Sequence, residues 1–450
     1  MSNIFFSKIK TVHFIGIGGI GISAIARMFL YPERSRGVAH VKVSGSDVAE
    51  SEVAEGLREA GAKIFIGQKA ENIPADCDLV IYSIAVPPDN PEFAEARRRG
   101  IKLVSYPEAL GEISRDKCTI AISGTHGKTT TTAMIAKILI DAGLDPTVVI
   151  GSFLQGLTLD REKGRTFETN FIAGKGKYFV VEACEYRRSF LNINPKIVVI
   201  TNIDADHLDY YKDLDDIESA FAELAARVPK NGAVICDFSD KRACRVAAAG
   251  QGKVTDFGEF LTKVPKLLVP GMHNKKDAAA ALAVADFLGV DLASAGKSLS
   301  GFSGAARRFE FRGKAKNGAL VYDDYGHHPT EILATLAGAR ELFPNEKIVV
   351  VFQPHLYSRT KQHLKGFTAA FKEASSVIFL PIYPAREEDP GDIHSQMIVD
   401  GVKKKGGDAH MTTTVDKAAK LTLKLSARGD IILTLGAGET NKVADILVRR

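Results

Sequence analysis

The chain has 450 residues, which is more than one ordinary hydrophobic core accommodates, so we expect two or three domains. Its 59 basic residues are interleaved with 54 acidic ones, and no basic run indicates nucleic-acid binding. The five cysteines are scattered without a C-x-x-C pair, which argues against a disulfide framework or a thiolate zinc site. No apolar run approaches the roughly 18 residues of a membrane helix. We therefore expect a cytoplasmic protein that binds neither nucleic acid nor membrane.

A strand and a glycine-rich turn come first in the chain. Residues 11–15 read TVHFI and precede the helical pattern of residues 22–30, so backbone N–H groups and a helix N-terminus are available for a diphosphate. A second strand, residues 41–47, ends where a dinucleotide fold keeps its ribose-binding acid. The pattern suits NAD and a UDP-sugar equally, and glycines that only let the helix pack on the strand are the structural alternative. The predicted substrate-binding residues here are Gly16, Gly18, Gly19, Gly21, Ser46 and Asp47.

The stretch GTHGKTT, residues 124–130, follows the apolar run TIAIS and predicts a phosphate-binding loop. It departs from the pattern G-x-x-x-x-G-K-[ST], because Ile122 stands where the first glycine belongs. Lys128 can reach the β- and γ-phosphates, and the Thr129 hydroxyl can ligate magnesium, whereas His126 can simply cap or fill the loop. The predicted ATP-binding residues of this stretch are Gly124, Thr125, His126, Gly127, Lys128, Thr129 and Thr130.

Two further strand ends carry candidate metal ligands. The run YFVVEACE ends near Glu182 and Glu185, and we choose Glu185 as the second magnesium anchor; a surface pair with a neighbouring arginine is the alternative. The run KIVVITNIDADHLD ends in several oxygen ligands and one imidazole, which suits a hard divalent cation. Its polar residues are Asn202, Asp204, Asp206 and His207. The predicted metal ligands are Thr129, Glu185 and His207.

A third strand–turn series begins at residues 319–331 and continues in residues 347–354. The carboxyl ends of strands are where α/β domains place ligands, and polar side chains gather there. They are Asp323, Asp324, Tyr325, His327, His328, Gln353, His355 and Arg359. Before this series, a proline–glycine turn carries His273 and Asn274 at the start of a helix, and ARRFEF supplies Arg307 and Arg308.

Alternating strands and helices of these lengths predict parallel sheets covered by helices, which is an α/β fold. The pattern lapses near residues 108 and 305, so we expect domains at 1–108, 109–305 and 306–450. Residues 151–181 are polar and rich in glycine, and we expect a small insertion or a strand pair there.

Seven motifs in this order resemble those of the Mur ligase family: GTHGKTTTT, EACEYRRSFL, TNIDADHLD, PGMHN, ARRFE, DDYGHHPTEI and FQPHLYSRT. The resemblance covers essentially the whole chain, including the N-terminal GIGGIGIS. It implies a Rossmann-like N-terminal domain that binds a UDP-sugar, a P-loop-type central ATPase domain, and a Rossmann-like C-terminal domain that binds an amino acid. It also accounts for the missing glycine, since Mur ligases resemble P-loop proteins that lack it.

The resemblance implies an ATP- and Mg²⁺-dependent, amide-forming ligase of peptidoglycan precursor synthesis. The lactyl carboxylate of UDP-N-acetylmuramate would attack the γ-phosphate, giving an acyl phosphate and ADP. The amine of L-alanine would then attack the acyl carbon, and phosphate would leave. Closure of the domains would bring the reactants together and exclude water. The expected partners are these two substrates, and the expected state is a monomer or a weak homodimer.

Position by position, the resemblance assigns Lys128 and Thr129 to the phosphates and first magnesium, Glu185 to the same metal and His207 to a second metal. Asn274 would lie near the adenine, Arg308 on the transferred phosphate and Asp324 near ATP. Tyr325, His327 and Arg359 would frame the alanine. Gln68 and Leu356 depart from the family pattern, which leaves Arg359 as the clearer carboxylate clamp. The predicted catalytic residues are Lys128, His207, Arg308 and His327.

Three alternatives stay open. A related ligase attaches a recycled murein tripeptide to the same nucleotide sugar, although the last two motifs favour a single amino acid. An NAD-dependent oxidoreductase would explain the first glycines and Asp47 but not the phosphate loop. A non-catalytic nucleotide sensor could retain the binding residues without turnover.

Overall fold

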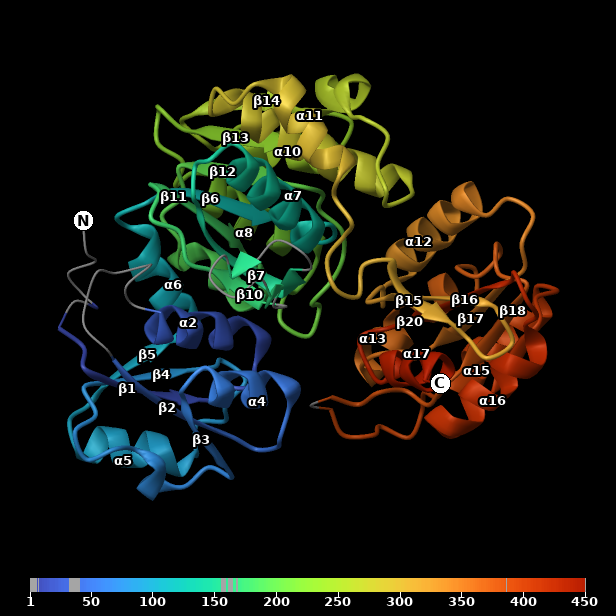
Figure 1. Ribbon diagram of the computed structural model, residues 1–450, viewed down its shortest axis with the longest axis horizontal. Coiled ribbons are helices and arrows are strands. Elements are labelled where there is room, and N and C mark those ends of the chain that lie inside the picture. Colours follow the sequence, from blue (N-terminus) through green and yellow to red (C-terminus); the bar gives the residue numbers. More distant parts are fainter. Residues whose placement is uncertain are drawn as a thin grey trace. The chain divides into compact units, whose positions relative to one another are not determined.

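The computed structural model describes Phe6 and residues 8–31, 41–154, 159–160, 165–166, 169–385 and 387–449. Three α/β sheets and a short two-stranded sheet account for its strands (Figure 1), which confirms the predicted fold class. The chain forms two compact units: Met1–Lys266 with Lys276–Phe302, and Leu267–Lys275 with Ser303–Arg450. Among the described residues, none of the helices has the length and apolarity needed to span a bilayer.

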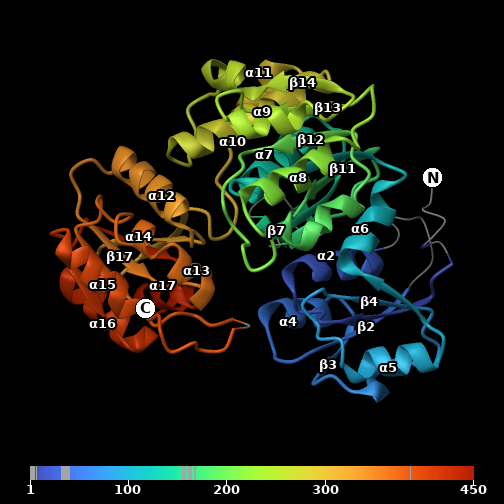
Figure 2. The same ribbon diagram turned by 180° about the vertical axis from the view of Figure 1, so that it is seen from behind.

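The N-terminal sheet has five parallel strands in the order β3-β2-β1-β4-β5. Both strands expected here form, and the order reverses between β1 and β4, where α/β sheets hold ligands at the carboxyl ends. Figures 1 and 2 show α2 on one face of this sheet and α5 on the other. The elements are β1 (Thr11–Ile15), α2 (Ile20–Leu30), β2 (Lys42–Asp47), α4 (Glu52–Glu59), β3 (Lys63–Ile66), η1 (Ala70–Asn72), β4 (Leu79–Tyr82), α5 (Pro91–Arg98) and β5 (Lys102–Ser105).

The central sheet has seven strands in the order β10-β7-β11-β6-β12-β13-β14, and only β10 is antiparallel to its neighbour. Strands β12 and β13 are apolar and completely buried along their length, as expected where helices cover both faces. The strands are β6 (Cys118–Ser123), β7 (Thr147–Leu154), β10 (Thr169–Ile172), β11 (Tyr178–Glu182), β12 (Ile197–Ile200), β13 (Ala233–Cys236) and β14 (Lys253–Asp256).

The helices of the central region are α6 (Tyr106–Ser114), α7 (Lys128–Asp141), η2 (Tyr186–Asn192), α8 (Leu214–Ala225), α9 (Lys241–Ala247), η3 (Phe257–Lys263), α10 (Met272–Phe287) and α11 (Leu292–Ser300). The expected strand pair within residues 151–181 is present as antiparallel β8 (Leu159–Asp160) and β9 (Arg165–Thr166). It follows that the polar insertion carries its own small sheet.

The C-terminal sheet has six strands in the order β15-β16-β20-β17-β18-β19, and only β15 is antiparallel to its neighbour. Separate apolar clusters cover its two faces. The strands are β15 (Glu310–Lys314), β16 (Leu320–Asp324), β17 (Ile348–Phe352), β18 (Ser376–Phe379), β19 (Ala409–Met411) and β20 (Ile431–Leu435). The helices are α12 (Pro329–Leu342), α13 (Tyr357–Gln362), α14 (Leu364–Phe367), α15 (Ser395–Lys404), α16 (Val415–Leu425) and α17 (Thr440–Val448).

The apparent lapse in pattern near residue 108 is the start of a helix. Ser105 caps α6, and its hydroxyl and backbone N–H both interact with Glu108 in a capping box, with Pro107 in the first turn. The predicted boundary at 108 therefore lies inside α6. The second predicted boundary, at 305, lies two residues after the second unit resumes at Ser303. The membership of Leu267–Lys275 in that unit was not expected from the sequence.

The N-terminal and central sheets share one apolar cluster, which includes Phe14 and Phe29 from the first and Phe179 from the second. Helix α2 packs against β7 and β10 of the central sheet. Asn170 on β10 is completely buried, and its amide donates to Ser23 Oγ at 2.9 Å and to the Ile20 carbonyl. This buried polar contact fixes the start of α2, where the glycine turn ends.

We expect Asn170→Ala to lower the free energy of unfolding of the first unit by about 1–3 kcal/mol, because the Ile20 carbonyl and the Ser23 hydroxyl lose a buried partner. Asn192→Ala is the matched control, since that exposed side chain donates to the Ser189 carbonyl, three residues away on the same segment. Urea unfolding followed by circular dichroism measures both. Equal stability of the two variants would contradict a fixing role for Asn170.

Candidate active site

The phosphate loop leaves β6 and enters α7 through two glycines with positive φ, +133° at Gly124 and +83° at Gly127. A Cβ on Gly124 would lie 2.0 Å from Thr201 Oγ1, and one on Gly127 would lie 2.5 Å from Asp277 Oδ1. Only glycine satisfies both the dihedral angle and the space. Asp277, on α10, was not anticipated from the sequence, because its contact with the loop comes from a helix about 150 residues later in the chain.

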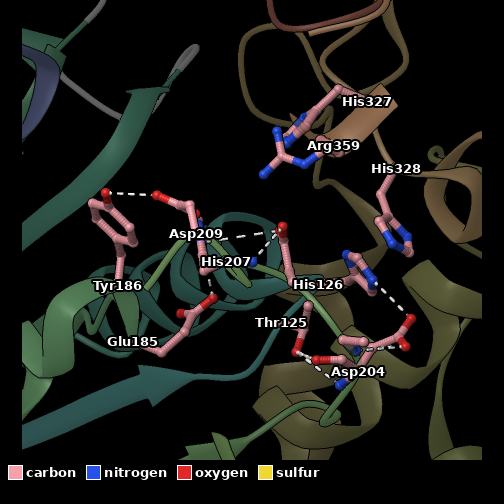
Figure 3. Close-up of polar contacts among 12 residues, drawn as sticks. Thr125, His126, Glu185, Tyr186, Asp204, His207, Asp209, His327, His328 and Arg359 are labelled. Atoms are coloured by element: carbon pink, nitrogen blue, oxygen red, sulfur yellow. Dashed lines mark hydrogen bonds and ion pairs between the residues drawn. The ribbon is translucent and has the colours of Figure 1, made fainter. Parts of the chain in front are cut away.

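The end of β12 holds the loop in shape. Asn202 accepts the Thr125 N–H on its carbonyl and the His126 N–H on Oδ1, each at 3.0 Å, and its amide donates to the His126 carbonyl at 2.9 Å. The Asp204 N–H donates to Thr125 Oγ1 at 2.9 Å, and His126 Nε2 lies 3.3 Å from Asp204 Oδ2 (Figure 3). The oxygen-rich turn after β12 therefore serves first as a scaffold for the phosphate loop.

Lys128 points back into its own loop. Its ammonium donates to the carbonyls of Gly124 at 2.6 Å and Thr125 at 3.0 Å, and it forms an ion pair with Glu185 at 3.0 Å. Burial of the ammonium favours its neutral form, but the carboxylates of Glu185 and Glu182 outweigh burial and hold the pKa of Lys128 above its usual value. The lysine therefore stays charged at neutral pH.

The two carboxylates after β11 have different partners. Glu182 ends the strand and accepts the Thr129 hydroxyl at 3.0 Å and the Gly151 N–H at 2.8 Å. Glu185 lies beyond the strand, is 3% exposed and pairs with Lys128. The sequence favoured Glu185 as the anchor next to Thr129, and in this structure the carboxylate bonded to Thr129 is Glu182. The choice of Glu185 as a metal ligand stays a prediction.

His207 adjoins the same carboxylate. Its Nε2 lies 3.6 Å from Glu185 Oε1, and its ring centroid lies 4.8 Å from that of Tyr186, whose hydroxyl donates to Asp209 at 2.9 Å (Figure 3). The backbone of His207 has φ +55°, a conformation that histidine adopts more readily than most residues but that still carries strain. Strand ends β6, β11 and β12 therefore bring Lys128, Glu185 and His207 together, as the sequence predicted.

The glycine turn after β1 is closed by the end of β2. The Gly16 and Ile17 N–H groups donate to the Ser46 carbonyl at 2.8 and 3.0 Å, and the Gly18 N–H donates to Asp47 Oδ2 at 2.8 Å. Gly16 has φ +78°, and Gly19 is the N-cap of α2. The Asp47 carboxylate thus shapes the turn, while substrate contacts of these residues stay a prediction.

Two predicted residues of this edge have side-chain surroundings that the sequence did not reveal. A Cβ on Gly21 would lie 2.8 Å from the Tyr106 ring, so this glycine lets the first turn of α2 approach α6. The Ser46 hydroxyl is completely buried and donates to Glu92 at 2.6 Å. Glu92 was missed, because a glutamate in the first turn of a helix normally indicates only a favourable dipole interaction.

In the second unit, Asp324 is 7% exposed at the end of β16 and accepts the N–H groups of Phe309 and Gly326, both at 2.8 Å. Burial raises the pKa of Asp324 to about 6, although the positive charge of Arg308 opposes the shift. Asp323 is completely buried and accepts Arg307 Nε at 2.8 Å. These two acids therefore hold the segment that carries both arginines against the sheet.

Tyr325, His327 and Arg359 lie near one another in the second unit. The guanidinium of Arg308 lies over the Tyr325 ring, 5.5 Å from its centroid, and His327 Nδ1 is 3.0 Å from the Tyr325 carbonyl. His327 and His355 have ring centroids 5.8 Å apart, and Arg359 Nη1 is 3.3 Å from His355 Nδ1. The ends of β16 and β17 thus gather the residues that the sequence assigned to the amino acid.

Asn274 also belongs to the second unit. It is 6% exposed, and its amide donates to the Pro270 carbonyl at 2.6 Å and lies 3.1 Å from His273 Nε2. Burial, together with the charge of Arg308, lowers the pKa of His273 to about 4, so this imidazole is neutral. The predicted ATP contacts of Asn274, Arg308 and Asp324 stay predictions.

Three family descriptions match the chain in succession. They are the Mur ligase family, catalytic domain, at residues 11–118, the Mur ligase middle domain at 122–263, and the Mur ligase, glutamate ligase domain, at 307–438. The chain belongs to the Mur ligase family.

Similar individual proteins include two curated relatives and two solved structures. The UDP-N-acetylmuramate–L-alanine ligase of Clostridium kluyveri is 40% identical over 99% of both chains, and that of Caldicellulosiruptor saccharolyticus is 39% identical over 96% of this chain and 97% of its own. The crystal structure of UDP-N-acetylmuramate-alanine ligase MurC from Thermotoga maritima superposes with a TM-score of 0.77 at 30% identity, covering 97% of this chain and 98% of its own. A murein peptide ligase from Psychrobacter arcticus shares the fold, with a TM-score of 0.71 at 23% identity over 98% of both chains.

We expect Lys128→Ala to lower turnover by at least about 100-fold, because the loop loses the cation that would neutralise transferring phosphoryl charge. Lys137→Ala, on the same helix but paired with Asp141 one turn away, is the control and should keep its activity. Phosphate release measures turnover, and circular dichroism verifies the fold, since Glu185 loses its partner. Retained activity in folded Lys128→Ala would rule out the phosphate-loop assignment.

Proposed function

We propose that the chain joins L-alanine to UDP-N-acetylmuramate and that ATP drives the reaction. Relatives that cover nearly the whole chain carry the name UDP-N-acetylmuramate–L-alanine ligase. The observation that carries the proposal is the cluster at one edge of the central sheet: a phosphate loop whose lysine pairs with Glu185, with Glu182 on Thr129 and His207 adjacent. An edge of this kind suits transfer of a phosphoryl group. In peptidoglycan precursor synthesis the product would be a nucleotide sugar whose lactyl carbonyl forms an amide with the amine of L-alanine.

The proposed reaction has two steps. A carboxylate oxygen of the sugar's lactyl group attacks the γ-phosphorus of ATP, the bond to the bridging oxygen breaks, and ADP leaves with that electron pair. The uncharged amine of L-alanine then attacks the acyl carbon of the acyl phosphate. The tetrahedral intermediate collapses to the amide, and phosphate leaves with one oxygen of the original carboxylate. The amine proton passes to a base or to water.

The residues of the first unit have defined tasks in this scheme. Lys128, kept charged by Glu185, places a cation at the phosphate loop, where negative charge spreads over the transferring group. The glycines of the loop allow its backbone to approach the phosphates closely. The glycine turn of Gly16, Gly18, Gly19 and Gly21, which leads into the N-terminus of α2, would receive the UDP diphosphate.

In the second unit, Arg308 would act on the transferred phosphate and Arg359 on the alanine carboxylate, which a guanidinium can grip with two parallel hydrogen bonds. Tyr325 and His327 would frame the same amino acid. Arg359 lies next to His355, His355 lies next to His327, and His327 contacts the Tyr325 carbonyl, which supports one compact binding site for a small zwitterion.

The donor set fits a divalent cation. The Thr129 hydroxyl and the Glu182 carboxylate are hard oxygen donors 3.0 Å apart, and Glu185 is a buried carboxylate paired with the adjacent Lys128 at 3.0 Å. We propose that Thr129 and Glu185 hold one Mg²⁺, with Glu182 as a further donor, and that His207 belongs to a second metal position. A bound cation would add positive charge beside the phosphates.

We expect Glu185→Gln and Glu182→Gln each to raise the Mg²⁺ concentration for half-maximal activity by about 10- to 100-fold, because each removes a carboxylate from the donor set. Glu223→Gln is the control, since that half-exposed carboxylate pairs with Arg188 instead. Activity titrations with Mg²⁺ at fixed ATP provide the comparison. An unchanged Mg²⁺ requirement in both variants would refute the metal assignment.

The related ligase that takes a murein tripeptide is the nearest alternative, and the sequence motifs of the C-terminal domain favour the single amino acid. We expect amide formation with L-alanine, and not with the tripeptide L-alanyl-γ-D-glutamyl-meso-diaminopimelate, when each is offered with UDP-N-acetylmuramate, ATP and Mg²⁺. Product mass and ADP release are the readouts. Turnover with the tripeptide alone would overturn the acceptor, and no ADP with either would favour a nucleotide sensor.

We further propose a cytoplasmic monomer or weak homodimer with domains near 1–108, 109–305 and 306–450. An oxidoreductase is a poorer explanation, because the Asp47 carboxylate already accepts the Gly18 N–H and hydride chemistry gives Lys128, Glu185 and His207 no task.

A further inference from the structure

Glu92, in the first turn of α5, is a carboxylate with no solvent exposure in the N-terminal domain. Four groups face it. The Ser46 hydroxyl donates to Oε2 at 2.6 Å, the Asn72 amide and the Lys69 N–H donate to Oε1 at 2.7 and 3.3 Å, and His13 Nε2 lies 3.5 Å from Oε2. Burial raises the pKa of Glu92, but His13, Ser46 and Asn72 together outweigh burial and hold this pKa below its usual value. Glu92 is therefore a buried carboxylate contacted from three segments, which are β1, β2 and residues 69–72.

The side chains that meet at Glu92 come from the sheet face that α5 covers. His13 on β1 lies opposite Ser44 on β2, and their side chains are 2.9 Å apart. Ser46 lies two residues further along β2 and so on the same face. An apolar cluster that includes Ile15 and Phe93 closes the space between α5 and the sheet. Buried charges of this kind are costly and persist only with complete sets of donors.

Ser46 and Asn72 connect Glu92 to the edge that would receive the nucleotide sugar. Ser46 carries the carbonyl that accepts the N–H groups of Gly16 and Ile17, and the next residue, Asp47, accepts the Gly18 N–H. Asn72 also donates to the Gly67 carbonyl at 2.9 Å, and the Gly67 N–H donates to the Asp47 carbonyl at 2.8 Å.

The loop after β3 is fixed from both sides. On one side, the Lys69 N–H donates to the Glu92 carboxylate. On the other, the Asn90 amide donates to the side-chain oxygen of Gln68 at 2.6 Å. Asn90 also caps α5 by accepting the Glu92 N–H. The glycine turn and this loop are thus joined through a single carboxylate, although they are about 50 residues apart in sequence. Loss of its charge would disturb both without touching the phosphate loop.

We infer that Glu92 is a positioning residue for the nucleotide-sugar subsite: its buried carboxylate sets the conformation of the glycine turn and of residues 67–72 against which the UDP moiety binds. The inference rests on the proposed function. Glu92 itself has no solvent exposure, so it would act on the substrate through Ser46 and residues 67–72.

The test is Glu92→Gln, which keeps the shape but places an NH₂ group where one carboxylate oxygen accepts hydrogen bonds. We expect KM for UDP-N-acetylmuramate to rise about tenfold, with kcat and the KM values for ATP and L-alanine within about twofold of wild type. Calorimetric binding of the nucleotide sugar in the absence of ATP should weaken by the same factor. Glu95→Gln, on the same helix but paired with Arg98, is the matched control and should match wild type.

A purely structural role predicts something else: a lower melting temperature, with the three KM values unchanged or moved together. Either pattern in Glu92→Gln overturns the inference. If that variant does not fold, Ser46→Ala removes one donor and leaves the carboxylate, and a folded Ser46→Ala with unchanged KM for the nucleotide sugar overturns it as well. A wild-type enzyme inactive on UDP-N-acetylmuramate would instead refute the proposed function, so the two failures are distinguishable.

Discussion

The buried ion pair between Lys128 and Glu185 is the interaction on which the catalytic edge of the central domain depends. Neither group is stable alone in its surroundings, because a charge removed from water needs a partner. Together they fix the phosphate loop to the segment after β11, and the two loop carbonyls that accept from Lys128 complete the arrangement. His207 and Tyr211 bind to the same residue, the latter through the Glu185 carbonyl. Three strand ends are thereby joined around one charge pair.

The N-terminal domain uses a buried carboxylate in a comparable way, with neutral donors in place of a lysine. Glu92 accepts hydrogen bonds from β2 and from residues 69–72, and Asp47 closes the glycine turn. These carboxylates therefore fix the conformation of the backbone around them. Asp324 in the C-terminal domain does the same when it accepts two backbone N–H groups. A preorganised backbone gives up less entropy when a ligand binds.

The family relationship and the geometry support the same chemistry by separate routes. The similarity over the full length to UDP-N-acetylmuramate–L-alanine ligases supports the choice of substrates. The phosphate loop with Lys128, Glu185 and His207 supports transfer of a phosphoryl group. The missing glycine of the standard loop fits this picture. Position 122 is a buried isoleucine within β6, so the strand runs further before the turn begins, and Gly124 supplies the first positive φ.

The sequence by itself determined the local elements, because glycine turns, strand patterns and caps depend on neighbours in the chain. It located β1 and the phosphate loop, and it assigned Lys128, Glu185 and His207 to the segments that follow β6, β11 and β12. Only the tertiary structure decided that Thr129 bonds to Glu182, that Ser46 faces Glu92, and that Asp277 abuts the loop. It also assigned Leu267–Lys275 to the second unit. These are pairings between distant segments, and a pattern with a period of a few residues carries no information about which buried charge meets which donor.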